Sequence, residues 1–200
     1  MRNIVLGARE FQKWNISLTS LSTKHSCEND IKRSRGKDNT TGSKYYRSCL
    51  SDILVHPFFW VKEKCGYFLV DVYLTIEGMD LTLENHIISS LNSLCPIVIK
   101  NGVWPPCLNG GLLAIYDYQQ VSLKKTFNRR SLFDFLQFIQ NIVCYFNENN
   151  GFCKLHIGDL AALHDEISEC FPKLLVAIHR IAKSELGKQR LQSYFQPCTA

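Results

Sequence analysis

Side chains that transfer protons or hold metals are present in this chain, but their spacing does not define a catalytic site. Imidazoles, whose pKa lies closest to neutral pH, occur at His25, His56, His86, His156, His164 and His179. His156 and His164 are separated by a glycine and a potential helix cap, which favours a solvated position for His164 and Asp165 over a shared metal ion. His56 precedes a proline at the end of a predicted helix, so we expect it to cap. The sequence has no GxSxG, HExxH or phosphate-binding glycine loop, and composition alone assigns no reaction.

Cysteine is abundant, and its nine positions are Cys27, Cys49, Cys65, Cys95, Cys107, Cys144, Cys153, Cys170 and Cys198. The count is odd, no CxxC pair occurs, and no secretory signal precedes the cysteines. Disulfide frameworks and zinc sites need closer spacing or an oxidising compartment. We therefore expect reduced thiols that pack as small apolar side chains, without a bound metal.

The net charge of +5 is concentrated near the N-terminus. Residues 24–48 carry seven Lys and Arg against three Asp and Glu, and they contain few large apolar side chains. Such a composition does not offset the entropy lost on ordering, so we predict a poorly structured linker. Residues 32–37, KRSRGK, are interpreted as part of this solvated linker, with a nuclear-localisation or RNA-contacting patch as the alternative.

The hydropathy pattern predicts neither a membrane span nor a secretory leader. No run of about 18 apolar residues occurs, and the apolar run at residues 4–6 is too short for a signal-peptide core. We expect a cytoplasmic protein without membrane contact, with the nucleus as the alternative location.

From Cys49 onward, apolar residues recur at the spacing of helices that bury one face. One set is Val61, Cys65, Phe68, Leu69, Val72 and Ile76, and a second is Leu83, Ile87, Leu91 and Leu94. Asp80 is suited to cap the second helix. Prolines and glycines between Pro96 and Gly111 then predict loops around the apolar run Ile97–Ile99.

The strongest helical pattern follows Ser131. Its apolar face is Leu132, Phe135, Leu136, Ile139, Ile142, Val143 and Phe146. Ser131 and Asp134 resemble a capping box, and the run NENNG at 147–151 predicts the end of this helix. Asp159 predicts the cap of another helix, and Pro172 the first turn of the last long one. The pattern therefore predicts a mainly helical body.

Six segments together carry a family resemblance. They are CLSDILVHPFFW at 49–60, FLVDV at 68–72, Trp104, DFLQFIQN at 134–141, KLHIGD at 154–159 and CFPKLL at 170–175. In order and spacing they resemble the kinase-extension nuclease (KEN) domain, most closely that of ribonuclease L. The inositol-requiring kinase–ribonuclease of the unfolded-protein response carries a related domain.

The resemblance implies an all-α KEN domain at 49–197 behind a poorly structured arm at 1–48. Residues 1–23 could be a remnant of the kinase-like domain that precedes KEN in these families, and they are too few to build an ATP site. The resemblance also implies single-stranded RNA as a partner, no cofactor, and a homodimer or a heterodimer with another KEN-containing protein.

The family cleaves RNA without a metal: a ribose 2′-OH attacks the adjacent phosphorus and leaves a 2′,3′-cyclic phosphate. By resemblance, the family's asparagine is kept as Asn141, its arginine is replaced by Gln140, its histidine by Tyr145, and an assisting tyrosine by Phe127. Gln140 carries no charge for a phosphoryl anion, and a phenol with a reference pKa of about 10 transfers protons poorly at neutral pH. Cys144 is either a substitute acid or, as the simpler interpretation, a buried thiol.

Four basic residues, Lys124, Lys125, Arg129 and Arg130, lie just before this helix. They either hold an RNA backbone or form a solvated loop, and in a paired domain they would be doubled. Three functional hypotheses follow. The chain is an endoribonuclease module with impaired catalysis, a pseudonuclease that dimerises with or competes against an intact relative, or a fragment of a longer kinase–KEN product.

Overall fold

The computed structural model describes residues 55–148, 151–186 and 191–196, all within a compact unit that spans residues 51–200. The described residues form α-helices α4 to α10 joined by short turns, and they contain no strand. The prediction of an all-α domain is confirmed. The predictions for residues 1–48, including the kinase remnant and the basic segment 32–37, lie outside the described residues.

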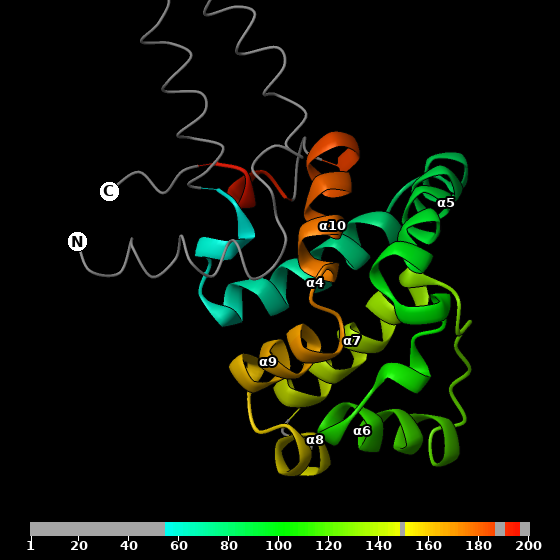
Figure 1. Ribbon diagram of the computed structural model, residues 1–200, viewed down its shortest axis with the longest axis vertical. Helices are drawn as coiled ribbons and strands as arrows, with labels where there is room; N and C mark the ends of the chain where they lie inside the picture. The colour runs from blue at the N-terminus through cyan, green and yellow to red at the C-terminus, as the bar shows by residue number, and fades with distance from the viewer. Residues whose placement is uncertain (1–54, 149–150, 187–190, 197–200) are drawn as a thin grey trace, which may run out of the picture. The chain divides into compact units, whose positions relative to one another are not determined.

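Helix α4 (Lys62–Glu77) is the central element of the bundle and packs against α7 and α9 (Figure 1). The predicted stripe is buried at Cys65, Phe68, Leu69, Val72 and Ile76, whereas Val61 precedes the helix and is exposed. His56 caps the short turn Pro57–Phe59, because its Nδ1 accepts a hydrogen bond from Phe58 N–H at 3.2 Å. The capping role expected for His56 is confirmed.

Helix α5 (Leu81–Val98) begins at the predicted cap, where Asp80 Oδ1 accepts from the N–H groups of Thr82 and Leu83, each at 3.1 Å. The loop predicted from Pro96 onward is wrong at its start, since α5 continues through Pro96 to Val98. A proline two residues before the end removes one backbone donor, and the last turn tolerates this loss.

Helix α6 (Gly110–Val121) occupies the other end of the segment predicted as loops. Its first turn is capped from a distant helix, because Glu166 Oε2 accepts from Leu112 N–H at 2.8 Å. Asn109, the residue before α6, uses its side-chain oxygen to accept from the Cys170 thiol at 3.1 Å. The helix therefore starts at two glycines with a cap that no local sequence pattern reveals.

Helix α7 (Leu132–Asn147) confirms the strongest predicted pattern. Ser131 Oγ accepts from Asp134 N–H at 3.1 Å, which is one half of the predicted capping box. The other half is wrong: Asp134 Oδ2 accepts from Asn128 N–H at 2.7 Å, so the carboxylate fixes the preceding loop instead of the Ser131 backbone.

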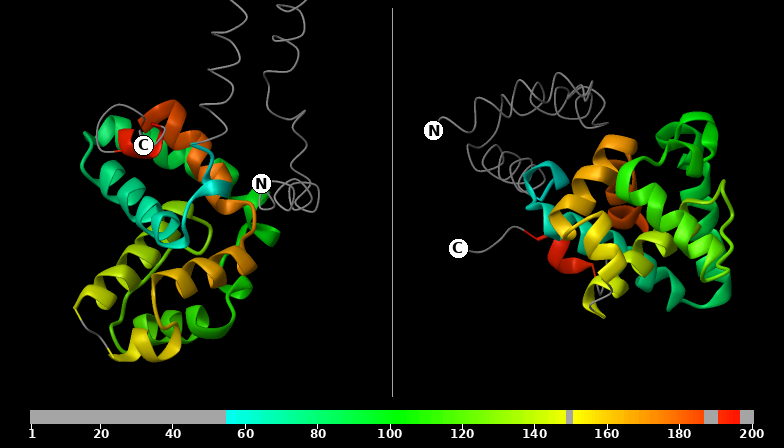
Figure 2. Two further views of the ribbon diagram at one scale, coloured as in Figure 1. Left: turned by 90° about the vertical axis from the view of Figure 1, so that its left-hand side faces the viewer. Right: turned by 90° about the horizontal axis from the view of Figure 1, so that it is seen from below.

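Three helices complete the bundle: α8 (Gly151–His156), α9 (Leu160–Cys170) and α10 (Leu174–Ile181). Asp159 caps α9 as predicted, accepting from Ala162 N–H at 2.8 Å. Pro172 lies in a turn before α10, not in its first turn. Figure 2 shows α8 at one end of the bundle, and α8 packs against α6.

Trp104 is fully buried and packs between α6, α7 and the loop that connects them. Its ring lies 5.2 to 5.9 Å from those of Tyr116, Phe127, Phe135 and Phe138. Its backbone N–H donates to Arg129 O and its indole Nε1–H to Asn128 O, at 3.1 and 3.3 Å. The second half of the loop between α6 and α7 is therefore hydrogen-bonded to the buried Trp104.

Candidate nucleic-acid interface

One side of α7 carries Gln140, Asn141, Cys144 and Tyr145, which we call the α7 edge. Their spacing along the chain puts them on neighbouring turns of the same face. All four are half-buried, whereas Ile139, Ile142 and Val143 on the opposite side are in the core. Three of the four residues assigned by resemblance, Gln140, Asn141 and Tyr145, thus stand together outside the packed interior.

Lys125 reaches the α7 edge from the preceding loop. Its Nζ donates to Asn141 Oδ1 at 2.7 Å and lies 5.6 Å from the centre of the Tyr145 ring. A short bond from an ammonium to an amide oxygen is charge-assisted, and the ring face adds a weaker attraction. The structure therefore brings an ammonium, an amide and a phenol into one site.

Gln119 on α6 is fully buried beneath Asn141, and sequence reasoning missed it. Its Oε1 accepts from Asn141 Nδ2 at 3.2 Å, and its backbone oxygen accepts from Lys125 N–H at 2.9 Å. Its Nε2 has no hydrogen-bond partner among the described residues. In the sequence, Gln119 is a polar residue at helical spacing from the inward-facing Leu112 and Ile115. This pattern becomes visible once α6 is known to be a helix.

Gln140 and Cys144 interact with each other within α7. Gln140 Nε2 donates to Cys144 Sγ at 3.1 Å, across one helical turn. The side-chain amide of Gln140, which the resemblance assigns to the family's arginine, therefore faces a thiol of its own helix. Cys144 is half-buried, so the expectation of a buried thiol holds only in part.

Tyr145 is poorly suited to proton transfer. Burial raises the pKa of its phenol above the usual value, and the nearby Cys153 and Tyr118 act in the same direction. Cys153 is fully buried, and burial raises the pKa of its thiol to about 11. Both groups therefore stay protonated at neutral pH.

Phe127 is a core residue. Only 9% of its surface is exposed, and its ring centre lies 5.9 Å from those of Trp104 and Phe138. Phe127, which the resemblance assigns to the family's tyrosine, therefore anchors the loop in the core and is not part of the α7 edge.

The four cations, which we call the basic loop (Lys124, Lys125, Arg129 and Arg130), divide into two groups. Lys125 contacts the α7 edge, and Lys124 beside it has a left-handed backbone with φ of 51°. Arg129 and Arg130 lie by the Trp104 turn, where the charge of Arg130 partly opposes the burial that raises the pKa of Cys95.

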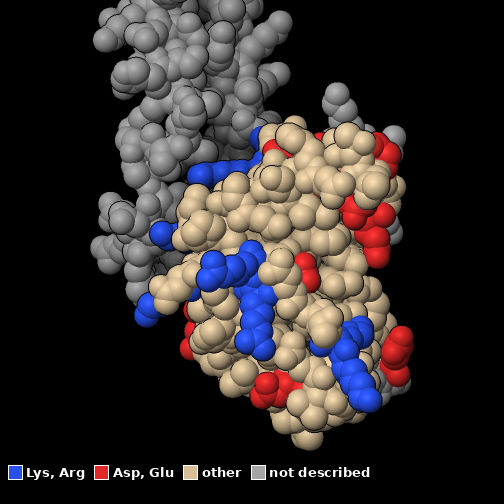
Figure 3. All heavy atoms as spheres, turned by 90° about the vertical axis from the view of Figure 1, so that its right-hand side faces the viewer, with Lys and Arg blue, Asp and Glu red and all other residues tan. Residues whose placement is uncertain are grey.

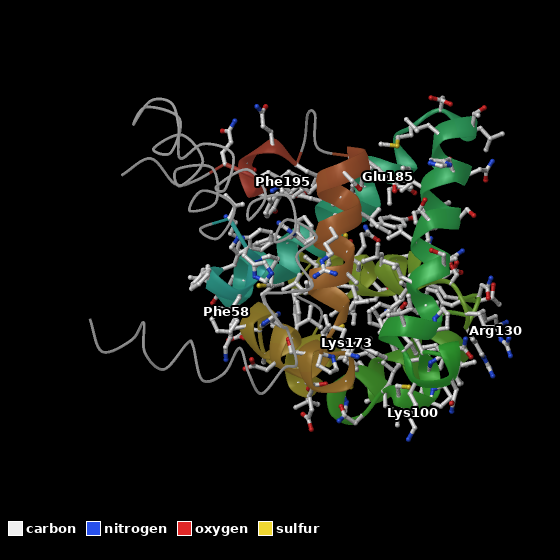
Figure 4. The ribbon with its side chains drawn as sticks, turned by 45° about the horizontal axis from the view of Figure 1, so that its top comes forward. Phe58, Lys100, Arg130, Lys173, Glu185 and Phe195 are labelled. Atoms are coloured by element: carbon white, nitrogen blue, oxygen red, sulfur yellow. The ribbon has the colours of Figure 1, made fainter. Side chains whose placement is uncertain are left out.

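The face that bears α5 and the basic loop has Lys and Arg in separate groups, with Asp and Glu between them (Figure 3). Figure 4 shows Arg130 projecting outward from the bundle. This face therefore does not form a continuous basic surface.

Among the described histidines, His164 and His156 each contact a side chain of their own helix. His164 is half-buried, with Nε2 3.3 Å from Ser168 Oγ, which corrects the expectation of a solvated position, and Asp165 pairs with Lys62 at 2.6 Å. The His156 ring packs on Phe152 with centres 4.3 Å apart. In the described part of the chain no cluster of His, Cys, Asp and Glu could hold a metal ion, and the described cysteines are free thiols.

Comparisons place these observations beside known proteins. No protein-family model matches the chain. The chain is similar to the serine/threonine-protein kinase/endoribonuclease IRE1a of Arabidopsis thaliana, with 23% identity over 152 residues. The aligned part is 75% of this chain and 17% of that protein, so the chain spans less than a fifth of the relative's length. The similarity supports a distant relationship to a kinase/endoribonuclease. Within residues 55–148, 151–186 and 191–196, no helix has the length and apolar character needed to cross a membrane.

Proposed function

We propose that residues 49–197 form a ribonuclease L-type KEN module that binds single-stranded RNA and has impaired endoribonuclease activity. The reaction is metal-independent attack of a ribose 2′-OH on the adjacent phosphorus. The P–O5′ bond breaks, and the 2′-OH proton is lost while the leaving 5′-oxygen gains one, which gives a 2′,3′-cyclic phosphate and a 5′-OH end. The six sequence segments and the distant similarity to a kinase/endoribonuclease both support this proposal.

The observation that carries the proposal is the pairing of Lys125 with Asn141, Nζ to Oδ1 at 2.7 Å, on the half-buried side of α7. The Lys125 ammonium supplies N–H donors for a phosphoryl group. The Asn141 amide holds the ammonium through its oxygen and directs its own NH₂ group to Gln119. Lys125 and Asn141 come from segments 16 residues apart, so the fold assembles the site.

The same site supports the impaired catalysis in this proposal. Gln140 brings no charge and directs its Nε2 to Cys144, and Tyr145 has a pKa raised further from neutral by burial. A missing acid or base typically costs about 10²–10⁴-fold in rate. The donors that bind a phosphate are thus present, while the groups that move protons at neutral pH have been replaced.

The raised pKa of Tyr145 also favours a second function, that of a pseudonuclease. In this form the module binds RNA without cleaving it, and acts by dimerising with an intact KEN protein or by competing with it for RNA. A chain of this kind would alter the activity of its partner in proportion to its own concentration.

The experiment compares the full chain with the variant Gln140→Arg/Tyr145→His on a single-stranded U-rich RNA, scoring cyclic-phosphate ends. Weak cleavage by wild type, lost in Asn141→Ala and increased in the double variant, supports the impaired nuclease. Activity in the double variant alone supports the pseudonuclease, and adding wild type to an intact KEN protein then tests inhibition. RNA binding absent from both forms would overturn the proposal.

A further inference from the structure

Lys125 determines which way the Asn141 amide faces. An ammonium has only donors, so the atom it contacts at 2.7 Å must be the amide oxygen. The Asn141 nitrogen must then point inward, where it donates to Gln119 Oε1 at 3.2 Å. The oxygen and nitrogen of a side-chain amide have nearly the same shape, so its orientation is usually assigned from its hydrogen bonds. Here the contact with the Lys125 ammonium determines the orientation of both amides.

This arrangement leaves the Gln119 NH₂ group unsatisfied. Gln119 is fully buried, and its Nε2 has no acceptor among the described residues. A buried donor without a partner destabilises the state that contains it, more than a carbonyl oxygen with a spare lone pair does. The charge-assisted bond from Lys125 to Asn141 maintains the arrangement despite this cost.

A second arrangement of the same groups removes the unsatisfied donor. If both amides turn over, Gln119 Nε2 donates to Asn141 Oδ1, and Asn141 Nδ2 points outward. The ammonium must then leave, because an outward NH₂ group would face it with a donor. An anion that draws the Lys125 ammonium away and accepts from the outward NH₂ stabilises this second arrangement.

We infer that Lys125 and Asn141 form a binding site for a phosphoryl oxyanion, and that Gln119 is the positioning residue that turns the Asn141 amide toward it. Lys125 supplies the cation that Gln140 lacks. Its backbone stays fixed, since Lys125 N–H donates to Gln119 O at 2.9 Å, so the side chain alone needs to move. The inference deepens the proposed function and rests on it for the source of the phosphate, which is the backbone of single-stranded RNA.

The test uses the ¹⁵N-labelled full chain and follows the side-chain NH₂ signals of Gln119 and Asn141 by NMR. Inorganic phosphate and a short single-stranded RNA are titrated in separate arms. We expect both NH₂ signals to shift in both arms. A shift at Gln119 is the informative readout, because this buried side chain cannot touch the ligand and a merely structural residue would not respond.

Lys125→Met, with Lys100→Met at an exposed position outside the basic loop as the control, measures the role of the cation. We expect about tenfold weaker binding for Lys125→Met and a salt dependence reduced by roughly 0.7 in slope, the effect of one lost phosphate contact on single strands. Lys100→Met should stay within about twofold of wild type, and Lys125→Arg should retain binding.

The outcomes separate the inference from the proposed function. If RNA binds, Lys125→Met and Lys100→Met weaken it equally and the Gln119 signal does not move, the oxyanion site and the role of Gln119 are wrong. The proposed RNA-binding module is then unaffected. Binding of inorganic phosphate with a Gln119 shift, but no binding of RNA, supports the oxyanion site and overturns the RNA assignment. If neither phosphate nor RNA binds, the oxyanion site and the proposed function are both wrong.

Discussion

Glu166 on α9 caps α6, a helix 54 residues earlier in the chain, by accepting a hydrogen bond from Leu112 N–H at 2.8 Å. A carboxylate at a helix N-terminus satisfies a free backbone donor and interacts favourably with the helix dipole. Because α6 carries Gln119, this contact between two helices also supports the candidate site.

Replacing Glu166 should therefore destabilise the domain. We expect Glu166→Ala to lower the free energy of unfolding by about 1–2 kcal/mol, and Glu166→Gln, which keeps an acceptor without the charge, by roughly half as much. Urea unfolding followed by circular dichroism measures both. An unchanged midpoint for Glu166→Ala would show that another group caps α6.

Gly111 should tolerate no side chain. A Cβ at this position would lie 2.3 Å from His156 O, 2.7 Å from Ile157 Cγ1 and 2.9 Å from Glu166 Oε1, so α6 and α8 would have to separate. We expect Gly111→Ala to cost about 1–3 kcal/mol, as overpacking of a close contact does. Gly151→Ala is the control, since a Cβ there would have no neighbour within 4 Å, and its unfolding midpoint should match wild type.

The same region shows what sequence could not predict. Asp80, Ser131 and Asp159 each cap the helix that follows them directly, so α5, α7 and α9 were predictable from local patterns. The cap of α6 comes from Glu166, and local sequence around two glycines and two prolines pointed instead to loops. Contacts between distant helices carry information that a short window of sequence does not hold.

The candidate site divides in a similar way. The spacing of Gln140, Asn141 and Tyr145 predicts a shared face as soon as α7 is recognised. The contacts of Asn141 with Lys125 and Gln119 depend on how α6 and the loop pack against α7, and sequence ranked Lys125 no higher than its three basic neighbours.

His179 should make the domain sensitive to acid. Its side chain is 6% exposed and lies among the rings of Trp60, Phe68 and Phe195. Burial lowers the pKa of its imidazole to about 4. The charges of His56, Lys183 and Arg180 add to this shift, and a hydrogen bond with the Val55 backbone opposes it. The unfolded chain binds a proton near pH 6.5 and the folded chain near pH 4, so stability falls as pH decreases between these values. The loss is at most about 3 kcal/mol.

His179→Phe should flatten this dependence, because a phenyl ring suits the aromatic cluster and takes up no proton. Urea unfolding at about pH 7, 5.5 and 4.5 gives the slope, with His156→Gln at an exposed position as the control. A residual slope from His56 and His164, whose pKa values burial also lowers, is expected. An equal slope in His179→Phe and wild type would contradict the assignment.

Tyr145 offers a matched pair of substitutions that separates binding from proton transfer. Because burial keeps its phenol protonated, Tyr145→Phe should leave the residual rate of RNA cleavage within about twofold of wild type. Tyr145→His in the Gln140→Arg background should raise the rate by about 10²–10⁴-fold and introduce a pH dependence near the imidazole pKa of about 6.5. Single-turnover cleavage of U-rich RNA between about pH 5 and 8 measures both effects. A tenfold loss in Tyr145→Phe would instead make the phenol a working acid or base, and a pH-independent gain in the histidine variant would assign the improvement to RNA binding.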